Sequence, residues 1–269
     1  MSFSQAQLDP QTREFYCQAL GILSRAQMPF LIGGAYAFER YTGIARHTKD
    51  LDIFTRPEYV QPVLDVFAQA GYDTEITVPH WLAKAHCGDN FVDVIFNSAH
   101  GCLPVNDVWF EHAVQDKVLD IPVQLCAPEE MIWSKAYIMA RDRFDGADVA
   151  HLILAYGDRM DWSRLVAHFG EHWRVLFAHL VLFGFIYPGE RSRIPDWVMD
   201  QLSQKLAQEN YQSEITEKLC QGTLLAPLQY QTDIEQWSYQ DARLKPNGSL
   251  TKIDLREWSD HLNQESDTD

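Results

Sequence analysis

The sequence has few cysteines and no apolar run long enough to cross a membrane. Its five cysteines are scattered over 269 residues and form no C-x-x-C pair, so neither a disulfide framework nor a cysteine zinc site is predicted. This cysteine usage favours a reduced, cytoplasmic compartment. The most apolar stretch, VLFAHLVLFGFIY at 175–187, is shorter than the ~20 residues of a membrane-spanning helix. We interpret it as a buried helix and expect no membrane partner.

Positive charge is scarce as well. Twenty-two Lys and Arg against thirty-eight Asp and Glu give a formal net charge of −16, which disfavours nonspecific attraction to a polyanion but leaves room for a local basic patch. The motifs GxxxxGK[ST], GxSxG and HExxH are missing, so the sequence predicts no P-loop, serine nucleophile elbow or zincin site. His168, His172 and His179 are expected to be core or surface residues rather than zinc ligands, because Gly170 interrupts their helix.

Apolar periodicity and Gly/Pro punctuation divide the chain near residue 127. Before this point, helical and strand-like segments alternate. After it, the pattern is mainly helical to about residue 220, and the last fifty residues are mixed and polar. Helices are predicted at 10–26, 35–41 and 57–70, and strands at 30–32, 50–55, 72–78, 81–86, 91–96 and 121–125. The expected domains are an α/β domain at 1–127 and a mainly helical domain with an irregular tail at 128–269.

Three carboxylates interrupt two of the predicted strands. Asp50 and Asp52 are two positions apart and therefore share one face of a strand, with Leu51 on the opposite face. Two such carboxylates repel each other unless a cation lies between them. An edge strand with both aspartates in water explains the alternation equally well. Asp93 then stands alone in the apolar segment FVDVIF. A buried, unpaired carboxylate is costly, and a cation shared with Asp50 and Asp52 would explain it.

The residues before these aspartates are suited to an anion. Gly33 and Gly34 separate a strand from a helix, where backbone N–H groups and the positive end of the helix favour anions. A tight turn is the simpler interpretation of the glycines. The segment containing Arg46, Thr48 and Lys49 is basic and polar, as expected for phosphate contacts or for a solvated loop. Carboxylates that hold Mg²⁺ beside a backbone cradle for phosphate are what nucleotidyl transfer needs.

Over residues 28–97 the sequence resembles the nucleotidyltransferase superfamily of DNA polymerase beta type. It is most similar to the abortive-infection-type and minimal members. The matching residues are GGA at 33–35, RHTKDLD at 46–52 and Asp93 in FVDVIF. This resemblance implies an α+β fold, with an N-terminal polymerase-beta-like mixed sheet flanked by helices and a mainly helical C-terminal region. The sequence departs from the family in having Gly34 where serine is common, and in a slightly long gap before Asp50.

The resemblance also implies roles for individual residues. Asp50 and Asp52 would coordinate two Mg²⁺ ions, with Mn²⁺ as the alternative, that hold the triphosphate of an NTP. Asp93 would complete the metal site on the acceptor side and help to deprotonate the attacking hydroxyl. The implied catalytic and metal-binding residues are thus the same three: Asp50, Asp52 and Asp93. The implied nucleotide- or phosphate-binding residues are Gly33, Gly34, Arg46, Thr48, Lys49 and Lys135.

Lys135 comes from a weaker similarity in the helical half. The segment EEMIWSKAYIMARDRFDGAD at 129–148 resembles a region in which a lysine and an arginine-aspartate cluster assist the active site. Lys135 and either Asp142 or Asp145 would match. The alternatives are a solvated helix lysine, and an N-cap at Asp145 followed by Asp148 in the first turn of a helix.

These features predict a metal-dependent nucleotidyltransferase that moves a nucleoside monophosphate from an NTP to an acceptor hydroxyl and releases pyrophosphate. The acidic charge favours a small molecule or a protein as acceptor. A toxin-like enzyme acting on tRNA is an alternative that needs a basic groove. The candidates for that groove are Arg40, Arg46, Lys49, Lys135, Arg141 and Arg143. A catalytically silent nucleotide- or protein-binding module on the same fold is the alternative from another class.

Overall fold

The computed structural model describes residues 8–45, 48, 50–98, 101–209 and 218–255, which belong to two compact units. The first unit takes in the described residues of Met1–Ala127 and Leu244–Asp269, and the second is Pro128–Arg243. The division at 127/128 falls where the sequence changes from mixed to helical periodicity. The described residues from Leu244 onward group with the first unit, whereas the sequence interpretation placed them with the helical half.

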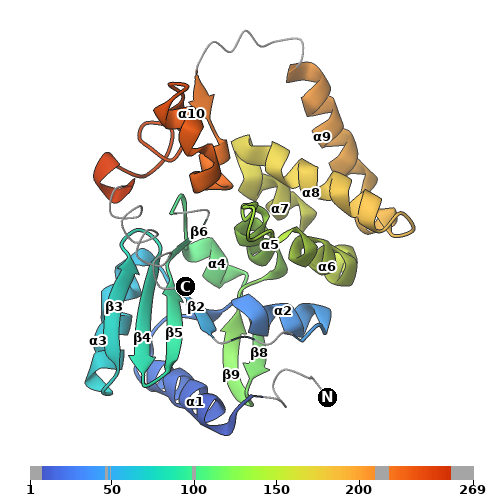
Figure 1. Cartoon of the computed structure of the whole chain (residues 1–269). Coiled ribbons are helices and arrows are strands. Elements are labelled where there is room, and N and C mark those ends of the chain that lie inside the picture. Colours follow the sequence, from blue (N-terminus) through green and yellow to red (C-terminus); the bar gives the residue numbers. More distant parts are fainter. Residues whose placement is uncertain (1–7, 46–47, 49, 99–100, 210–217, 256–269) are drawn as a thin grey trace. The chain divides into compact units, whose positions relative to one another are not determined.

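A mixed sheet forms the centre of the first unit (Figure 1). In the described residues, seven strands follow the order β3-β4-β5-β2-β1-β9-β8. Strand β2 runs parallel to β5 and β1 parallel to β9, while the other neighbours are antiparallel. This confirms the mixed sheet of the expected α+β class. The strands are β1 Leu31–Ile32, β2 Leu51–Phe54, β3 Asp73–Val78, β4 Leu82–Cys87, β5 Asn90–Ile95, β8 Val114–Val118 and β9 Ile121–Leu125.

Helices flank this sheet. α1 (Pro10–Arg25) begins at the N-cap Asp9, whose carboxylate accepts hydrogen bonds from the N–H groups of Gln11 and Thr12, both at 3.1 Å. α1 packs against α3 (Val60–Gln69), and the two helices contact the strands β3, β4 and β5. α2 (Gly34–Thr42) follows β1 directly and ends at the left-handed Gly43. The buried strand residues under these helices include Leu51, Ile53, Val92 and Val94.

Several short elements of the structure were not predicted from the sequence. Strand β8 has the polar sequence VQDKV at an edge of the sheet, and therefore lacks the apolar alternation by which strands are recognised. α4 (Asp107–Glu111) is a single turn and a half, capped by the Asn106 side chain. The remaining pair is β6 Asn97–Ser98 with β7 Leu103–Pro104.

The second unit is mainly helical, as expected. Its helices are α5 Pro128–Ala136, α6 Gly146–Tyr156, α7 Trp162–Phe169, α8 Trp173–Ile186, α9 Asp196–Glu209 and α10 Gln231–Glu235, with a strand pair β10 Leu219–Cys220 and β11 Gln240–Asp241. The buried helix predicted at 175–187 is present as α8, but it is buried on one face only. α8 buries Leu176, Leu180 and Phe183 against its neighbours, but Phe185 is 80% exposed. No helix among the described residues has the length and apolar character that a membrane span requires.

Candidate functional site

Three carboxylates meet where β2 and β5 run side by side. The parallel register places Asp52 directly beside Asp93, and Asp50 lies two residues before Asp52. One carboxylate oxygen from each of the three lies within 4.8 Å of the others. Among the residues that the structure describes, this is the one group of three or more potential ligands close enough to share a metal ion. The predicted meeting of Asp93 with Asp50 and Asp52 is therefore present in the fold.

The chemistry of this group fits a hard divalent cation. Carboxylate oxygens are the ligands that Mg²⁺ and Mn²⁺ prefer, and Asp93 is only 9% exposed. Burial raises the pKa of Asp93, and the charge of Asp50 adds to this although Lys84 opposes it. Burial also raises the pKa of the Tyr16 hydroxyl, with further contributions from Asp50, Asp52 and Asp93. Burial is the main cause of both shifts, and the neighbouring carboxylates add to them.

The two glycines bring the start of α2 directly against Asp52. The Gly33 N–H donates to the Asp52 carbonyl at 3.1 Å, and Gly34 adopts a left-handed φ of +52°. A Cβ added at Gly34 would overlap Oδ2 of Asp52, and one added at Gly33 would overlap the ring of Phe54. A side chain at either position would therefore have to displace Phe54 or Asp52, and the left-handed backbone at Gly34 also favours glycine. The first N–H groups of a helix have no intrahelical acceptor and attract anions. The N-terminal end of α2 is therefore suited to bind phosphate beside the carboxylates.

The loop before β2 is described only in part. The Thr48 hydroxyl donates to the Asp50 carboxylate and lies 3.3 Å from the Asp50 carbonyl oxygen. Thr48 was expected to bind phosphate, and the contact that the structure gives it is with a carboxylate of the site. The predicted phosphate ligands Arg46 and Lys49 lie outside the described residues.

Sequence reasoning missed Lys84, a basic residue of the same site. Lys84 on β4 lies opposite Asp93 on β5, and its Nζ is 3.0 Å from Asp93 Oδ1. The ammonium also lies 4.2 Å from the centre of the Phe91 ring. A lysine in a strand ordinarily indicates a solvated position. The signal that could have found it is the turn C-G-D-N at 87–90, because a two-residue turn at 88–89 fixes this register.

Lys135 lies in the second unit, on α5. Its Nζ is 3.1 Å from Asp145 Oδ2 and 2.8 Å from Asp148 Oδ2, and Arg143 approaches Asp145 at 3.2 Å. Burial alone would raise the pKa of Asp145, but Lys135 and Arg143 outweigh it and hold this pKa below its usual range. Asp145 occupies the predicted N-cap position of α6 and Asp148 lies in the first turn, although the Asp145 carboxylate makes no side-chain cap bond. The nucleotide-binding role of Lys135 stays a prediction.

The histidines considered as zinc ligands, His168, His172 and His179, contact separate partners. His168 contacts Glu130 at 2.8 Å, His172 contacts the Tyr137 hydroxyl at 2.9 Å, and His179 contacts a backbone carbonyl at 2.9 Å. Each ring thus has its own local hydrogen bond, in agreement with the expectation that they are structural.

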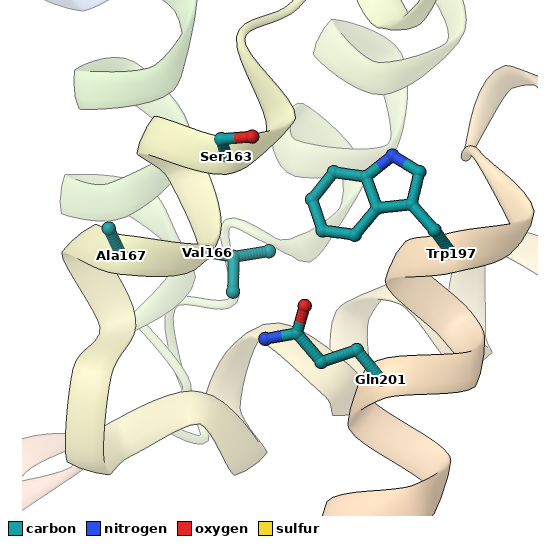
Figure 2. A pocket seen from close by; sticks show the side chains of 5 residues that line it. All are labelled: Ser163, Val166, Ala167, Trp197 and Gln201. Atoms are coloured by element: carbon teal, nitrogen blue, oxygen red, sulfur yellow. The ribbon is translucent and has the colours of Figure 1, made fainter.

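A small pocket lies between α7 and α9 of the second unit (Figure 2). Trp197 and Gln201 of α9 face Ser163, Val166 and Ala167 of α7 across it. None of the predicted site residues lines this pocket.

Comparison with known proteins gives matches among solved structures alone. No protein-family model matches the chain, and no curated protein does. The lincosamide antibiotic adenylyltransferase LnuA, bound to lincomycin, is 16% identical, with 54% of this chain and 96% of that chain covered and a TM-score of 0.38. ANT(2")-Ia, in complex with adenylyl-2"-tobramycin, is 14% identical, with coverages of 73% and 99% and a TM-score of 0.39.

An antigenic nucleotidyltransferase-like protein from Paracoccidioides brasiliensis is 13% identical, with coverages of 64% and 93% and a TM-score of 0.36. These three solved structures are what the chain is similar to, each at low identity and a low TM-score. At these TM-scores, neither a substrate nor a residue role is transferred from the matched proteins to this chain.

Proposed function

We propose that the chain is a metal-dependent nucleotidyltransferase that moves a nucleoside monophosphate from an NTP to an acceptor hydroxyl. One observation carries this proposal. Asp50, Asp52 and Asp93 present carboxylate oxygens within 4.8 Å of one another, beside the start of α2. A carboxylate cluster next to an anion-binding helix end is what a metal-bound triphosphate requires.

Each group of site residues would have a separate role in this reaction. Asp50, Asp52 and Asp93 would hold Mg²⁺ or Mn²⁺, which when bound supplies charge neutralisation to the phosphates. The backbone at Gly33 and Gly34 would lie against the triphosphate. The acceptor oxygen forms a bond to the α-phosphorus while the bond from that phosphorus to the bridging oxygen breaks. Pyrophosphate leaves with the bond's electron pair, and the hydroxyl proton passes to Asp93.

A small molecule or a protein is the acceptor class that the described charges favour. Three of the six cations considered for a tRNA groove are already paired within their own units. Arg40 binds Asp116 through two bonds of 2.6 and 2.9 Å, and Lys135 and Arg143 bind carboxylates of the second unit. Neutralised cations contribute little to phosphate-backbone affinity. Together with the net charge of −16, this disfavours the tRNA alternative.

The test uses NTPs labelled in two positions. Purified protein is incubated with Mg²⁺, cell extract and each NTP carrying label at the α- or the γ-phosphate. The expected result is α-label in the acceptor and γ-label in pyrophosphate. Asp52→Asn should abolish transfer, whereas Asp65→Asn should not, because Asp65 is an exposed carboxylate on α3.

Transfer of the γ-label to the acceptor would instead indicate phosphoryl transfer and overturn the proposal. The silent-module alternative predicts Mg²⁺-dependent nucleotide binding by the wild type without transfer of either label. Absence of both transfer and binding would remove the proposed function altogether.

A further inference from the structure

Lys84 is fixed inside the carboxylate site by two contacts. Its ammonium lies 3.0 Å from Asp93 Oδ1 and 4.2 Å from the centre of the Phe91 ring, and its side chain is 20% exposed. A lysine in water samples many rotamers, whereas one held by a carboxylate and an aromatic face loses that freedom. The ammonium is therefore a built part of the site.

The strand register places this ammonium in line with the carboxylates. Asp52 lies beside Asp93 on the next strand, and Lys84 lies beside Asp93 on its other side. The three side chains form one row across β2, β5 and β4. Asp50, Asp52 and Asp93 contribute −3 and Lys84 contributes +1, which leaves −2 for the four side chains. That is the charge that one divalent cation neutralises.

A divalent cation and the Lys84 ammonium would both interact with the negative charge of Asp93. Two cations a few ångströms apart repel each other strongly where water is partly excluded. The ammonium thus lowers the affinity of the protein for a divalent ion that includes Asp93 among its ligands. A nucleoside triphosphate adds several negative charges, which allow the two cations to be held together.

We propose that Lys84 is a built-in competitor of the divalent cation at Asp93, so that full cation binding is coupled to the arrival of the nucleotide. This inference rests on the proposed function, because it takes the three aspartates as cation ligands. Before the nucleotide binds, Lys84 neutralises Asp93 and reduces repulsion among the carboxylates. A lysine that merely positions Asp93 would have the opposite effect, since its loss would then weaken cation binding.

The experiment measures Mn²⁺ affinity by electron paramagnetic resonance, at pH 8 and fixed ionic strength, without nucleotide. Lys84→Gln keeps a hydrogen-bond donor and removes the charge, whereas Lys84→Arg keeps the charge. Lys117→Gln makes the same charge change on β8, at the opposite edge of the sheet from β3 and β4. We expect Lys84→Gln to bind Mn²⁺ about tenfold more tightly, a change of ~1.4 kcal/mol. Lys84→Arg and Lys117→Gln should match the wild type.

The coupling is tested by repeating the titration with a non-hydrolysable NTP analogue, which should reduce the gain of Lys84→Gln to less than about threefold. Should Lys84→Gln fail to fold by circular dichroism, Lys84→Met is the second neutral variant, and its affinity should rise in the same way. Unchanged or weaker Mn²⁺ binding by the neutral variant overturns the competition. An equal gain with and without the analogue overturns the coupling.

Failure of the proposed function would look different. In that case the wild type and Asp52→Asn would bind Mn²⁺ equally poorly, because no carboxylate site would exist for Lys84 to modulate.

Discussion

Each unit of this protein gathers aspartates in a partly buried cluster, but the two clusters are balanced differently. In the first unit, Asp50, Asp52 and Asp93 lie within reach of one another, and Lys84 pairs with Asp93. In the second unit, the carboxylates and the cations are equal in number. Lys135 bridges Asp145 and Asp148, and Arg143 binds Asp145.

The pKa shifts of the two clusters point in opposite directions. The pKa of Asp93 is raised, because burial and Asp50 outweigh Lys84. The pKa of Asp145 is lowered, because Lys135 and Arg143 outweigh burial. Removing one partner from a matched buried cluster is strongly destabilising, whereas an excess of carboxylates is destabilising unless a cation is bound between them. The balance of charge, rather than the presence of aspartates, distinguishes the two clusters.

The largest expected effect comes from removing Lys135. Lys135→Met leaves Asp145 and Asp148 buried without their shared cation, and breaking a buried pair in this way costs about 3 kcal/mol or more. We expect the free energy of unfolding to fall by that amount in urea titrations followed by circular dichroism. Arg141→Met is the matched control, because Arg141 is an exposed cation nearby in the sequence, and it should change stability little.

The pH dependence of this loss has a definite sign. Because the folded-state pKa of Asp145 is lowered, its contribution is fully present above the ordinary pKa of aspartate and is lost as the pH falls through the lowered value. The stabilities of the wild type and Lys135→Met should therefore converge in acid. An unchanged stability together with a raised KM for NTP would instead favour the nucleotide-binding role of Lys135. It would contradict the interpretation of the second cluster as structural.

The second effect tests the approach of α2 to Asp52. Gly34→Ala would introduce a Cβ that overlaps the Asp52 carboxylate, and displacing a ligand by about 1 Å can cost about 100-fold in rate. Gly43→Ala is the matched control. Gly43 is also left-handed, but a Cβ there meets nothing within 4 Å.

In both variants, an alanine in the left-handed conformation lowers the free energy of unfolding by ~1–2 kcal/mol. Only Gly34→Ala should lose Mn²⁺ binding and nucleotidyl transfer as well. Equal activity of the two variants would show that Asp52 tolerates the displacement.

The sequence allowed much of the first unit to be predicted, for identifiable physical reasons. Asp9 and Pro10 mark the start of α1, and Gly43 marks the end of α2. Asp93 is recognisable because a carboxylate inside an apolar strand has no ordinary explanation. Strand β8 and the five-residue helix α4 lack such signals, since the strand is polar and the helix is short.

The parts of the site that could not be predicted depend on neighbours that are distant in the sequence. Lys84 becomes a site residue only through its register with Asp93. The need for glycine at position 34 follows from its left-handed backbone and from the carboxylate beyond it. The exposure of Phe185 likewise depends on which faces of α8 are covered by its neighbours. These features depend on tertiary packing and leave no local pattern in the sequence.

The smallest effect is also the one that distinguishes the two clusters most directly. Asp50→Asn removes one like charge from the unbalanced cluster and keeps an oxygen that can accept the Thr48 hydroxyl bond. With EDTA present, we expect the melting temperature to rise by about 2–4 °C, corresponding to ~1 kcal/mol. Asp116→Asn is the control in the same unit. It removes a carboxylate that is matched by Arg40, so it should lower the melting temperature.

Saturation with Mn²⁺ should reverse the order of the wild type and Asp50→Asn. At an ion concentration of 100 times Kd, the wild type gains about 2.7 kcal/mol, which exceeds the advantage of the variant in EDTA. Asp50→Asn binds the ion more weakly and gains less, so the two melting temperatures cross as Mn²⁺ is added. Parallel curves without a crossing would mean that Asp50 is a surface carboxylate like any other. The difference in charge balance between the two clusters would then say nothing about cation binding.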